Sequence, residues 1–319
     1  MLASVIGQRG VDAMAFLLAF ALTALTDSIF RDKLPHDHGR AFAVNGELSK
    51  GKARGSGLIF VLCIALVSLA FLPFNTEYVV YNVLLIASML SGYLDDAAET
   101  AWNEYKKGII DFVIAVLAGV TYLNFNGCGV HFLQWSFTLP YAVYLLLIVI
   151  LIWASINVVN CTDGVDGLFG TLASIALGAT GYALYRFLDK PLWGVCALIL
   201  MGCLGAYLLF NASPCMLMMG DAGSRAIGLF LGILMLETGN VLLSVPFAVV
   251  ILLNGGLGLL KLSVMRLFHT KKFMPGLRTP LHDECRKNRG WSDTQTVFRF
   301  AIAQLLCAMV GLLAMGLMA

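Results

Sequence analysis

Long apolar stretches separated by short polar clusters follow one another through the whole chain. A helix needs about 20 apolar residues to cross a hydrocarbon core of about 30 Å, and most of these stretches approach that length. The pattern therefore predicts ten membrane-spanning helices and an all-α polytopic membrane protein. The predicted spans cover residues 12–30, 57–73, 78–94, 108–124, 139–158, 167–187, 192–210, 223–236, 241–267 and 296–318.

Two of the predicted spans depart from the usual length. The segment 223–236 is short, and the segment 241–267 is long enough to predict either a tilted helix or a break near Asn254, Gly255 and Gly256. The chain shows no internal repeat and no proline-rich linker. Residues 1–319 are therefore expected to form a single integral membrane domain.

The composition excludes an ordinary water-soluble protein. Hydrophobic residues make up 59% of the 319 residues and charged residues only 13%, whereas soluble domains carry about 25% charged residues. The net charge of +2 and the lack of a basic stripe with interleaved aromatic residues argue against a nucleic-acid partner. The eight cysteines show no zinc-ligand spacing. The lipid bilayer is therefore the expected environment.

The few basic residues are distributed unequally between the two sides of the predicted bundle. Seventeen of the 21 Lys and Arg residues fall on one side, and only Arg9, Arg186 and Lys190 fall on the other. By the positive-inside rule, the side rich in Lys and Arg is cytosolic. With ten spans, both termini are then expected outside.

Four loops on the predicted cytosolic side carry ionisable side chains at the membrane edge. These residues are Asp95, Asp96, Asp163, Asp166, Asp221 and His282. An ionisable residue beside a bundle interior is costly and points to a function. Since the four loops open on the same side, helix packing can bring them together into one active site on the cytosolic face.

The pair Asp95 and Asp96 ends the third span, where the helix dipole is negative. Two carboxylates at this end need a nearby cation. A metal ion, or Lys106 and Lys107 at the start of the next span, would supply it. The alternative is a solvated acidic loop end without a function.

The stretch 157–167 holds two aspartates, two asparagines and two glycines. Asp163 and Asp166 are three residues apart, so they share a face if the sixth helix begins here. Gly164 and Gly167 allow close backbone approach, and free N–H groups at a helix start suit an anionic or nucleotide ligand. A simple helix cap would need only one aspartate.

Asp221 and His282 each have a simpler interpretation as well. Asp221 can be a plain N-cap of the eighth helix, and a lone loop histidine is usually solvated. Taken together, however, five aspartates beside several lysines indicate a site for a hard cation and anionic substrates. Mg²⁺ suits one or two carboxylates completed by water and substrate phosphate. A membrane-edge site of this kind indicates phosphoryl chemistry on a lipid.

The motifs Gly92–Asp96, Asn157–Gly167, Phe210–Gly228 and Thr279–Phe300 resemble those of the polyprenyl-phosphate N-acetylhexosamine-1-phosphate transferases. Within this superfamily, the tail from Pro280 through Trp291 to Phe300 is most similar to the phospho-N-acetylmuramoyl-pentapeptide transferases, the MraY family. The resemblance implies a ten-helix transferase of the bacterial cytoplasmic (inner) membrane. It implies transfer of phospho-MurNAc-pentapeptide from UDP-MurNAc-pentapeptide to undecaprenyl phosphate with Mg²⁺, giving lipid I and UMP for peptidoglycan synthesis.

The resemblance also implies roles for individual residues. Asp221 would be the main Mg²⁺ ligand, Asp95 with Asp96 would position or deprotonate the lipid phosphate, and His282 would be the remaining catalytic residue. The implied substrate-binding residues are Lys50, Lys107, Asn160, Asp163, Gly164, Asp166, Asn211 and Ser224.

The chain departs from the family pattern in three places. His282 is followed by Asp283 and Glu284 where the family has three consecutive histidines. The stretch 49–57 replaces a family segment rich in lysine, threonine and glycine, and Met218 stands where an aromatic residue commonly stacks on the base.

Other interpretations stay open at this point. A sister transferase using UDP-GlcNAc or another UDP-HexNAc shares the metal and nucleotide motifs and differs around His282. An ion-coupled transporter or lipid-binding protein would instead place charges near the bilayer midplane, in paired broken helices. Gly228 and Gly232 form a G-x-x-x-G pair, which we interpret as a close helix contact rather than a homodimer seam, with a homodimer left open.

Overall fold

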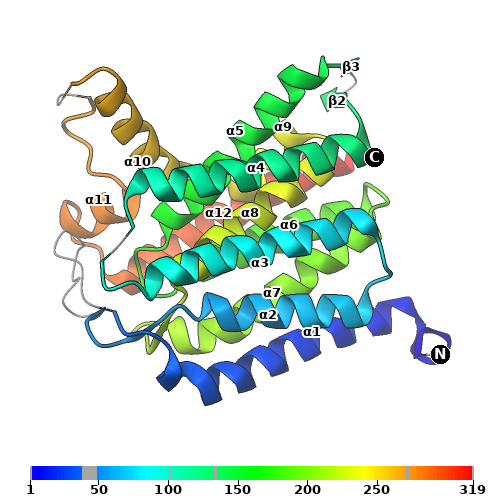
Figure 1. The fold of residues 1–319 in the computed structure, drawn as a ribbon, viewed down its shortest axis with the longest axis horizontal. Helices are drawn as coiled ribbons and strands as arrows, with labels where there is room; N and C mark the ends of the chain where they lie inside the picture. Colours follow the sequence, from blue (N-terminus) through cyan, green and yellow to red (C-terminus); the bar gives the residue numbers. More distant parts are fainter. Residues whose placement is uncertain (1, 38–48, 101, 133–134, 271–272, 318–319) are drawn as a thin grey trace.

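Long helices lying side by side make up the described chain, which comprises residues 2–37, 49–100, 102–132, 135–270 and 273–317 of a computed structural model (Figure 1). The helices are α1 (Leu2–Phe30), α2 (Gly57–Phe71), α3 (Thr76–Asp96), α4 (Glu104–Asn126), α5 (Tyr141–Thr162), α6 (Leu168–Arg186), α7 (Pro191–Asn211), α8 (Gly220–Glu237), α9 (Val241–Ser244), α10 (Val249–Leu267), α11 (Leu281–Lys287) and α12 (Asp293–Gly316). Two 3-10 segments, η1 (Arg31–Lys33) and η3 (Val245–Ala248), extend α1 and join α9 to α10.

The all-α membrane fold predicted from the apolar pattern is confirmed. Among the described residues, eight helical segments are long and apolar enough to cross a membrane. They are Gly7–Lys33, α3, α4, α5, α6, α7, Val241–Leu267 and α12. The segment predicted at 57–73 is the shorter apolar helix α2, and the one predicted at 223–236 is the 18-residue helix α8.

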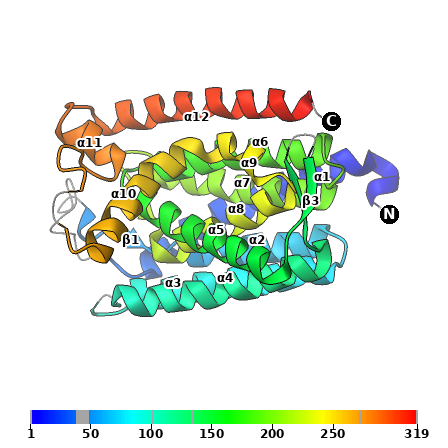
Figure 2. The ribbon, with the colours of Figure 1, turned by 90° about the horizontal axis from the view of Figure 1, so that it is seen from above.

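Helix α8 lies at the centre of the bundle, where α2, α3 and α5 pack around it (Figure 2). Every residue from Gly220 to Glu237 is buried, so this helix has no face toward lipid or solvent. Gly228 lies against the backbone of Ile156 on α5, and the Ser155 hydroxyl donates to the Gly228 carbonyl oxygen at 2.7 Å. The G-x-x-x-G pair is therefore a close helix contact inside the chain.

A buried ion pair joins α8 to α4. Arg225 donates through Nε to Asp111 Oδ1 at 3.1 Å, and both side chains are almost fully buried. Arg225 is one of the 17 basic residues counted on the predicted cytosolic side, but it lies within α8 and not in a loop. Its charge is balanced by Asp111 rather than by solvent.

The interruption in the long ninth span occurs earlier than predicted. The chain adopts a 3-10 turn at Val245–Ala248, which contains Pro246, and proline cannot donate the N–H that a continuous α-helix needs. The expected break near Asn254 is absent, since residues 254–256 lie within the regular helix α10. Gly255 instead allows α10 to approach the Val158 carbonyl of α5.

The two ends of the bundle differ. Both chain termini lie at one end, together with a hairpin in which β2 (Gly129–Phe132) pairs antiparallel with β3 (Trp135–Thr138) (Figure 1). Helix α11, the carboxyl end of α3 and the carboxyl end of α10 lie at the opposite end (Figure 1). A second two-stranded sheet pairs β1 (Ala53–Arg54) in parallel with β4 (Leu217–Met218).

Candidate active site

Three of the predicted aspartates meet where α3 ends and α8 begins. Two glycines make this approach possible. A Cβ atom on Gly92 would lie 2.3 Å from the Asp221 carbonyl oxygen, and one on Gly220 would lie 2.2 Å from Asp96 Oδ2. Gly220 also has a φ of +68°, a conformation that other residues rarely adopt. The backbones of the two helices can therefore touch beside the carboxylates.

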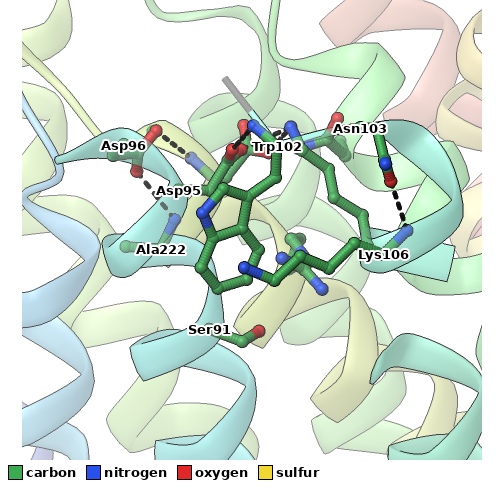
Figure 3. Close-up of polar contacts among 12 residues, drawn as sticks. Ser91, Asp95, Asp96, Trp102, Asn103, Lys106 and Ala222 are labelled. Carbon is green, nitrogen blue, oxygen red and sulfur yellow. Dashed lines mark hydrogen bonds and ion pairs between the residues drawn. The ribbon is translucent and has the colours of Figure 1, made fainter. Parts of the chain in front are cut away.

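Asp96 caps helix α8 from outside that helix. Its two carboxylate oxygens accept the backbone N–H groups of Asp221 at 3.1 Å and Ala222 at 3.0 Å (Figure 3). These N–H groups are in the first turn of α8, where no intrahelical acceptor is available. The Asp96 side chain is fully buried. Its role in this geometry is to fix the start of α8, and with it Asp221.

Arg54 binds three carboxylates at once and was not among the predicted site residues. Its guanidinium lies 2.8 Å from Asp96 Oδ1, 3.0 Å from Asp37 Oδ1 and 3.3 Å from Asp221 Oδ1. Burial alone would lower the pKa of Arg54, but Asp96, Asp221 and Asp37 outweigh this effect and hold the pKa above its ordinary value. The guanidinium therefore stays charged.

The small sheet explains how Arg54 reaches the site. Arg54 on β1 is paired with Met218 on β4, and Met218 lies three residues before Asp221. The backbone N–H groups of Gly55 and Ser56 both donate to the Met218 carbonyl oxygen, at 3.0 and 3.2 Å. This pairing joins segments more than 160 residues apart, so local sequence gives no signal for it.

Lys107 lies between Asp95 and Asp221. Its ammonium group forms an ion pair with Asp95 Oδ2 and lies 3.2 Å from Asp221 Oδ2. The other Asp95 oxygen accepts the backbone N–H of Trp102 at 2.7 Å (Figure 3). Lys106 does not share this position, because its ammonium group lies over the Trp102 ring, 3.2 Å from the ring centroid. Of the two adjacent lysines, Lys107 is the one that enters the cluster.

The loop between α5 and α6 holds the second group of predicted residues. Helix α5 ends at Thr162 and α6 begins at Leu168, so Asp163 and Asp166 lie in a loop and do not share a helix face. The condition for a common face, a helix that begins at Asp163, is not met, because α6 begins only after Gly167, which has a φ of +78°. Asp166 accepts the Cys215 backbone N–H at 3.0 Å, which ties this loop to the segment before β4.

Three predicted polar residues hold the surroundings of the cluster in place. Asn211 accepts the Gly167 N–H at 2.9 Å and donates to the Leu217 carbonyl at 2.9 Å, so its amide is engaged within the protein. Asn160 on α5 donates to the Ser224 hydroxyl on α8 at 3.0 Å. These contacts connect the α5–α6 loop to the start of the 211–224 segment, and helix α5 to its end.

His282 is buried and lies against the same loop. A Cβ atom on Gly164 would lie 2.5 Å from His282 Nε2, so only glycine leaves room for the imidazole ring at this position. Asn254 Oδ1 accepts the His282 backbone N–H at 2.9 Å and lies 3.1 Å from His282 Nδ1. The solvated-loop interpretation of His282 is therefore wrong.

The contacts of Asn254 define the tautomer of His282. The backbone N–H of His282 needs an acceptor, and in the Asn254 amide only the oxygen can accept, so the oxygen must face His282. Since this oxygen can only accept, the imidazole Nδ1 beside it must carry a proton and donate it. Burial, followed by the charge of Arg286, lowers the pKa of His282 to about 3. The ring is therefore neutral near pH 7, with an unprotonated Nε2 beside Gly164 that can accept a hydrogen bond.

The two residues that replace the family histidines have separate contacts. Asp283 Oδ1 lies 3.8 Å from His282 Nε2 and 3.9 Å from Arg286. Glu284 accepts the Arg278 backbone N–H at 2.9 Å and the Asn288 side-chain amide at 2.7 Å. Asp283 thus lies beside the imidazole, whereas Glu284 fixes the loop that leads to α11.

The two lysines of the 49–57 stretch differ in position. Lys52 lies 3.8 Å from Asp166 Oδ2 and donates to Cys215 Sγ at 3.3 Å. Lys50 is exposed on the turn before β1. Within the described ranges, no ion pair joins Lys50 to the aspartates of the cluster. The 49–57 stretch therefore contacts the aspartate cluster through Arg54. It contacts the α5–α6 loop through Lys52.

The donor chemistry of the cluster fits a hard divalent cation. Asp95 and Asp221 each direct a carboxylate oxygen at the Lys107 ammonium, so a positive charge already lies between them. Such oxygens are the ligands that Mg²⁺ prefers, and Mg²⁺ commonly keeps water and substrate oxygens in its remaining positions. In the described part of the chain, no group of three or more His, Cys, Asp or Glu side chains is arranged to hold a metal ion by itself, so water and substrate oxygens would have to supply the remaining ligands.

Comparison with known proteins identifies the family. Residues 78–239 match the model of glycosyl transferase family 4. A phospho-N-acetylmuramoyl-pentapeptide-transferase of Treponema pallidum is 40% identical over 308 residues, which cover 89% of this chain and 82% of that protein. The chain belongs to this transferase family. Proteins of the same name from Bartonella quintana and Oceanobacillus iheyensis are 29% and 28% identical, covering 88% and 93% of this chain and 85% and 96% of those proteins.

This phospho-N-acetylmuramoyl-pentapeptide-transferase family member is a multi-pass protein of the bacterial inner membrane. The family-model match begins in α3 and ends just after α8. It therefore contains the aspartate cluster and Lys107. Arg54 and His282 lie outside it, on segments that the fold brings to the same end of the bundle.

Proposed function

We propose that the protein transfers phospho-MurNAc-pentapeptide from UDP-MurNAc-pentapeptide to undecaprenyl phosphate, forming lipid I and UMP for peptidoglycan synthesis. Residues 1–319 would act as one membrane-embedded transferase domain. The observation that carries the proposal is the meeting of Asp95, Asp96 and Asp221 with Arg54 and Lys107, in a chain of this family. Phosphoryl transfer asks a protein mainly for positioning and charge neutralisation, and this cluster offers both.

Arg54 and Lys107 are the cations that we assign to substrate phosphates. Their contacts with Asp221, at 3.3 and 3.2 Å, are longer than the roughly 2.7–2.9 Å of strong charge-assisted hydrogen bonds. Phosphate oxygens can therefore compete with Asp221 for both groups. When Mg²⁺ is bound, Asp221 would hold it, and the ion would neutralise charge on the diphosphate.

The acceptor needs no strong general base. A phosphate monoester has a second pKa near 6, so the lipid phosphate is largely dianionic at pH 7. One of its oxygens attacks the β-phosphorus of the UDP-sugar, the bond from that phosphorus to the bridging oxygen breaks, and UMP leaves with the bonding electron pair. The product keeps a new P–O–P linkage to the lipid, and no redox change occurs.

The contacts of the paired aspartates support direct attack over a covalent aspartyl-phosphate intermediate. Both Asp96 oxygens are occupied by backbone N–H groups, and the side chain is buried. Both Asp95 oxygens are occupied by Trp102 and Lys107. A carboxylate held in this way is a poor nucleophile. Recovery of a phosphosugar adduct on either aspartate, from enzyme given UDP-MurNAc-pentapeptide without lipid phosphate, would contradict the direct scheme.

The loop around Gly164 is the part of the site that we assign to the nucleotide and sugar. Asn160, Asp163 and Asp166 would hold the nucleoside and diphosphate end. The neutral His282 presents an acceptor nitrogen at Gly164, which suits an N–H or O–H donor on the sugar. In this assignment, the contacts that recognise the sugar lie next to Asp283, a position where the chain differs from its family pattern.

The nearest competing function is a transferase that uses UDP-GlcNAc or another UDP-HexNAc. Purified protein supplied with undecaprenyl phosphate and Mg²⁺ is expected to release UMP from UDP-MurNAc-pentapeptide and not from UDP-GlcNAc. The opposite preference would assign the sister activity. Release from neither donor, by protein shown to be folded, would exclude both transferases.

A further inference from the structure

A groove of about 400 Å³ lies between α1, α6 and α7. The parts of these helices that carry Arg9 and Arg186 belong to the end of the bundle where the chain termini lie. Figure 1 shows how the three helices run to that end. Leu177, Val195, Leu198 and Met201 are among the residues that form its apolar walls. All three helices are membrane spans. The groove is therefore expected to lie within the bilayer. It is at the opposite end of the bundle from the aspartate cluster.

The polar end of the groove carries two arginines, Arg9 and Arg186. Both are exposed, and both line the same groove. Neither forms an ion pair with any residue in the described ranges. The third cation of this side, Lys190, is different because its ammonium lies 2.9 Å from Glu237 Oε2.

The carboxylate at the polar end does not balance the two arginines. Asp12 is buried, and its oxygens accept hydrogen bonds from Gln8 Nε2 and the Tyr185 hydroxyl, each at 3.0 Å. One negative charge with neutral partners faces two free positive charges. The polar end of the groove therefore has a net positive charge. This is notable because only three Lys and Arg residues lie on this side of the protein, and two of them are at the groove.

The groove has the two parts that an amphipathic lipid requires. Helix α6 rises about 14 Å between Leu177 and Arg186, which is enough to bury a substantial part of one acyl chain along an apolar wall. Tyr182 and Tyr185 lie near its charged end, the level at which aromatic side chains usually meet lipid headgroups. Met14 and Leu17 on α1 are also exposed.

We propose that this groove binds an anionic phospholipid, with the headgroup phosphate held by Arg9 and Arg186 and one acyl chain lying between α6 and α7. The lipid would belong to the leaflet opposite the aspartate cluster. The proposal does not depend on the transferase assignment, because it rests on a separate cavity at the other end of the bundle.

Native mass spectrometry of the full chain in detergent tests the proposal, with phosphatidylglycerol and phosphatidylcholine added in turn. The protein is expected to retain one phosphatidylglycerol and to bind phosphatidylcholine more weakly. One basic residue near a lipid surface changes affinity about fivefold. Arg9→Gln and Arg186→Gln should therefore each weaken phosphatidylglycerol binding about fivefold, and together about 25-fold.

Two further variants separate the groove from general charge effects. Gly178→Leu should fill the apolar part and reduce phosphatidylglycerol binding with both arginines present, because a Cβ atom there meets only the Met201 sulfur, at 3.4 Å. Lys33→Gln removes an exposed cation from the far end of the α1 segment and should leave lipid binding unchanged. Melting curves in the same detergent establish that each variant is folded.

Four results would overturn the proposal. The first is equal retention of both lipids, and the second is full retention by the double arginine variant. The third is a change in the number of protomers per particle in the double variant with unchanged lipid binding, which would make the groove a contact between two copies of the chain. Displacement of phosphatidylglycerol by millimolar inorganic phosphate would assign the arginines to a soluble anion instead.

Discussion

Asp96 on α3 accepts the backbone N–H groups of Asp221 and Ala222 on α8, so a carboxylate of one membrane helix caps the first turn of another. Caps normally come from the residue that precedes the helix. Here the cap is supplied by a helix 125 residues earlier in the chain. Asp221 is therefore held in position by the residue next to Asp95, and the paired aspartates have different contacts.

The cap predicts a clear effect of Asp96→Asn on stability. The amide keeps one acceptor for the α8 backbone but loses the other, and it leaves Arg54 beside an uncharged group. Removing a partner from a buried hydrogen bond costs about 1–3 kcal/mol. The melting temperature in detergent should fall and UMP release should drop. Asp32→Asn, at an exposed carboxylate, is the control and should melt like the parent protein. Equal melting of Asp96→Asn and Asp32→Asn would contradict the cap.

Arg54→Lys tests the guanidinium that the sequence motifs did not indicate. Lysine keeps the charge but cannot reach Asp37, Asp96 and Asp221 together, because it lacks the planar fork of donors. UMP release should fall at least about tenfold while the protein remains folded, since each lost charge-assisted contact is worth about 1.5–3 kcal/mol. Lys33→Gln should keep parental activity. Undiminished turnover by Arg54→Lys would show that only the charge matters.

A pH effect on stability follows from His282. Its pKa is about 3 in the folded protein because of burial and then Arg286, whereas an unfolded histidine titrates near 6.5. The unfolded state therefore binds the proton first as the pH falls. The contribution of neutral His282 to the free energy of unfolding is complete above about pH 6.5 and is lost progressively toward pH 3.

The measurement is the melting temperature between pH 7 and pH 4. It should decrease on acidification in the parent protein and decrease less steeply in His282→Gln. His131→Gln, at an exposed histidine of the hairpin, provides the control and should keep the parental slope. If His282→Gln and the parent protein lose stability in parallel, the buried neutral imidazole is not the cause.

The Asp111 and Arg225 pair predicts a rescue. Asp111→Leu leaves Arg225 buried without its partner, and breaking a buried pair on one side costs about 3–5 kcal/mol. Adding Arg225→Met removes the stranded charge, so the double variant should melt closer to the parent protein than Asp111→Leu does. A double variant less stable than the single one would mean that Arg225 has a further partner.

The helices were predictable because each apolar run carries its own signal, independent of the rest of the chain. The aspartate cluster was predictable in part because loop parity places Asp95, Asp96 and Asp221 on one side of the bundle. Neither inference requires knowledge of which helices touch.

Arg54 and Asn254 were not predictable in the same way. Arg54 reaches the cluster through a two-residue parallel pairing with Met218, and such short strands leave no periodic pattern. Asn254 lies inside an apolar helix beside two glycines and therefore looked like a break in that helix. Its role is visible only when His282 is placed against it.

Turnover by Asp221→Asn tests the central claim most directly, because Asp221 is the residue at which the cap from Asp96, the two cations and the proposed metal meet. Mg²⁺-dependent UMP release from UDP-MurNAc-pentapeptide and undecaprenyl phosphate should fall by about 10²–10³-fold, in protein that melts near the parental temperature. Full metal-dependent turnover by folded Asp221→Asn would contradict the placement of the active site at this cluster.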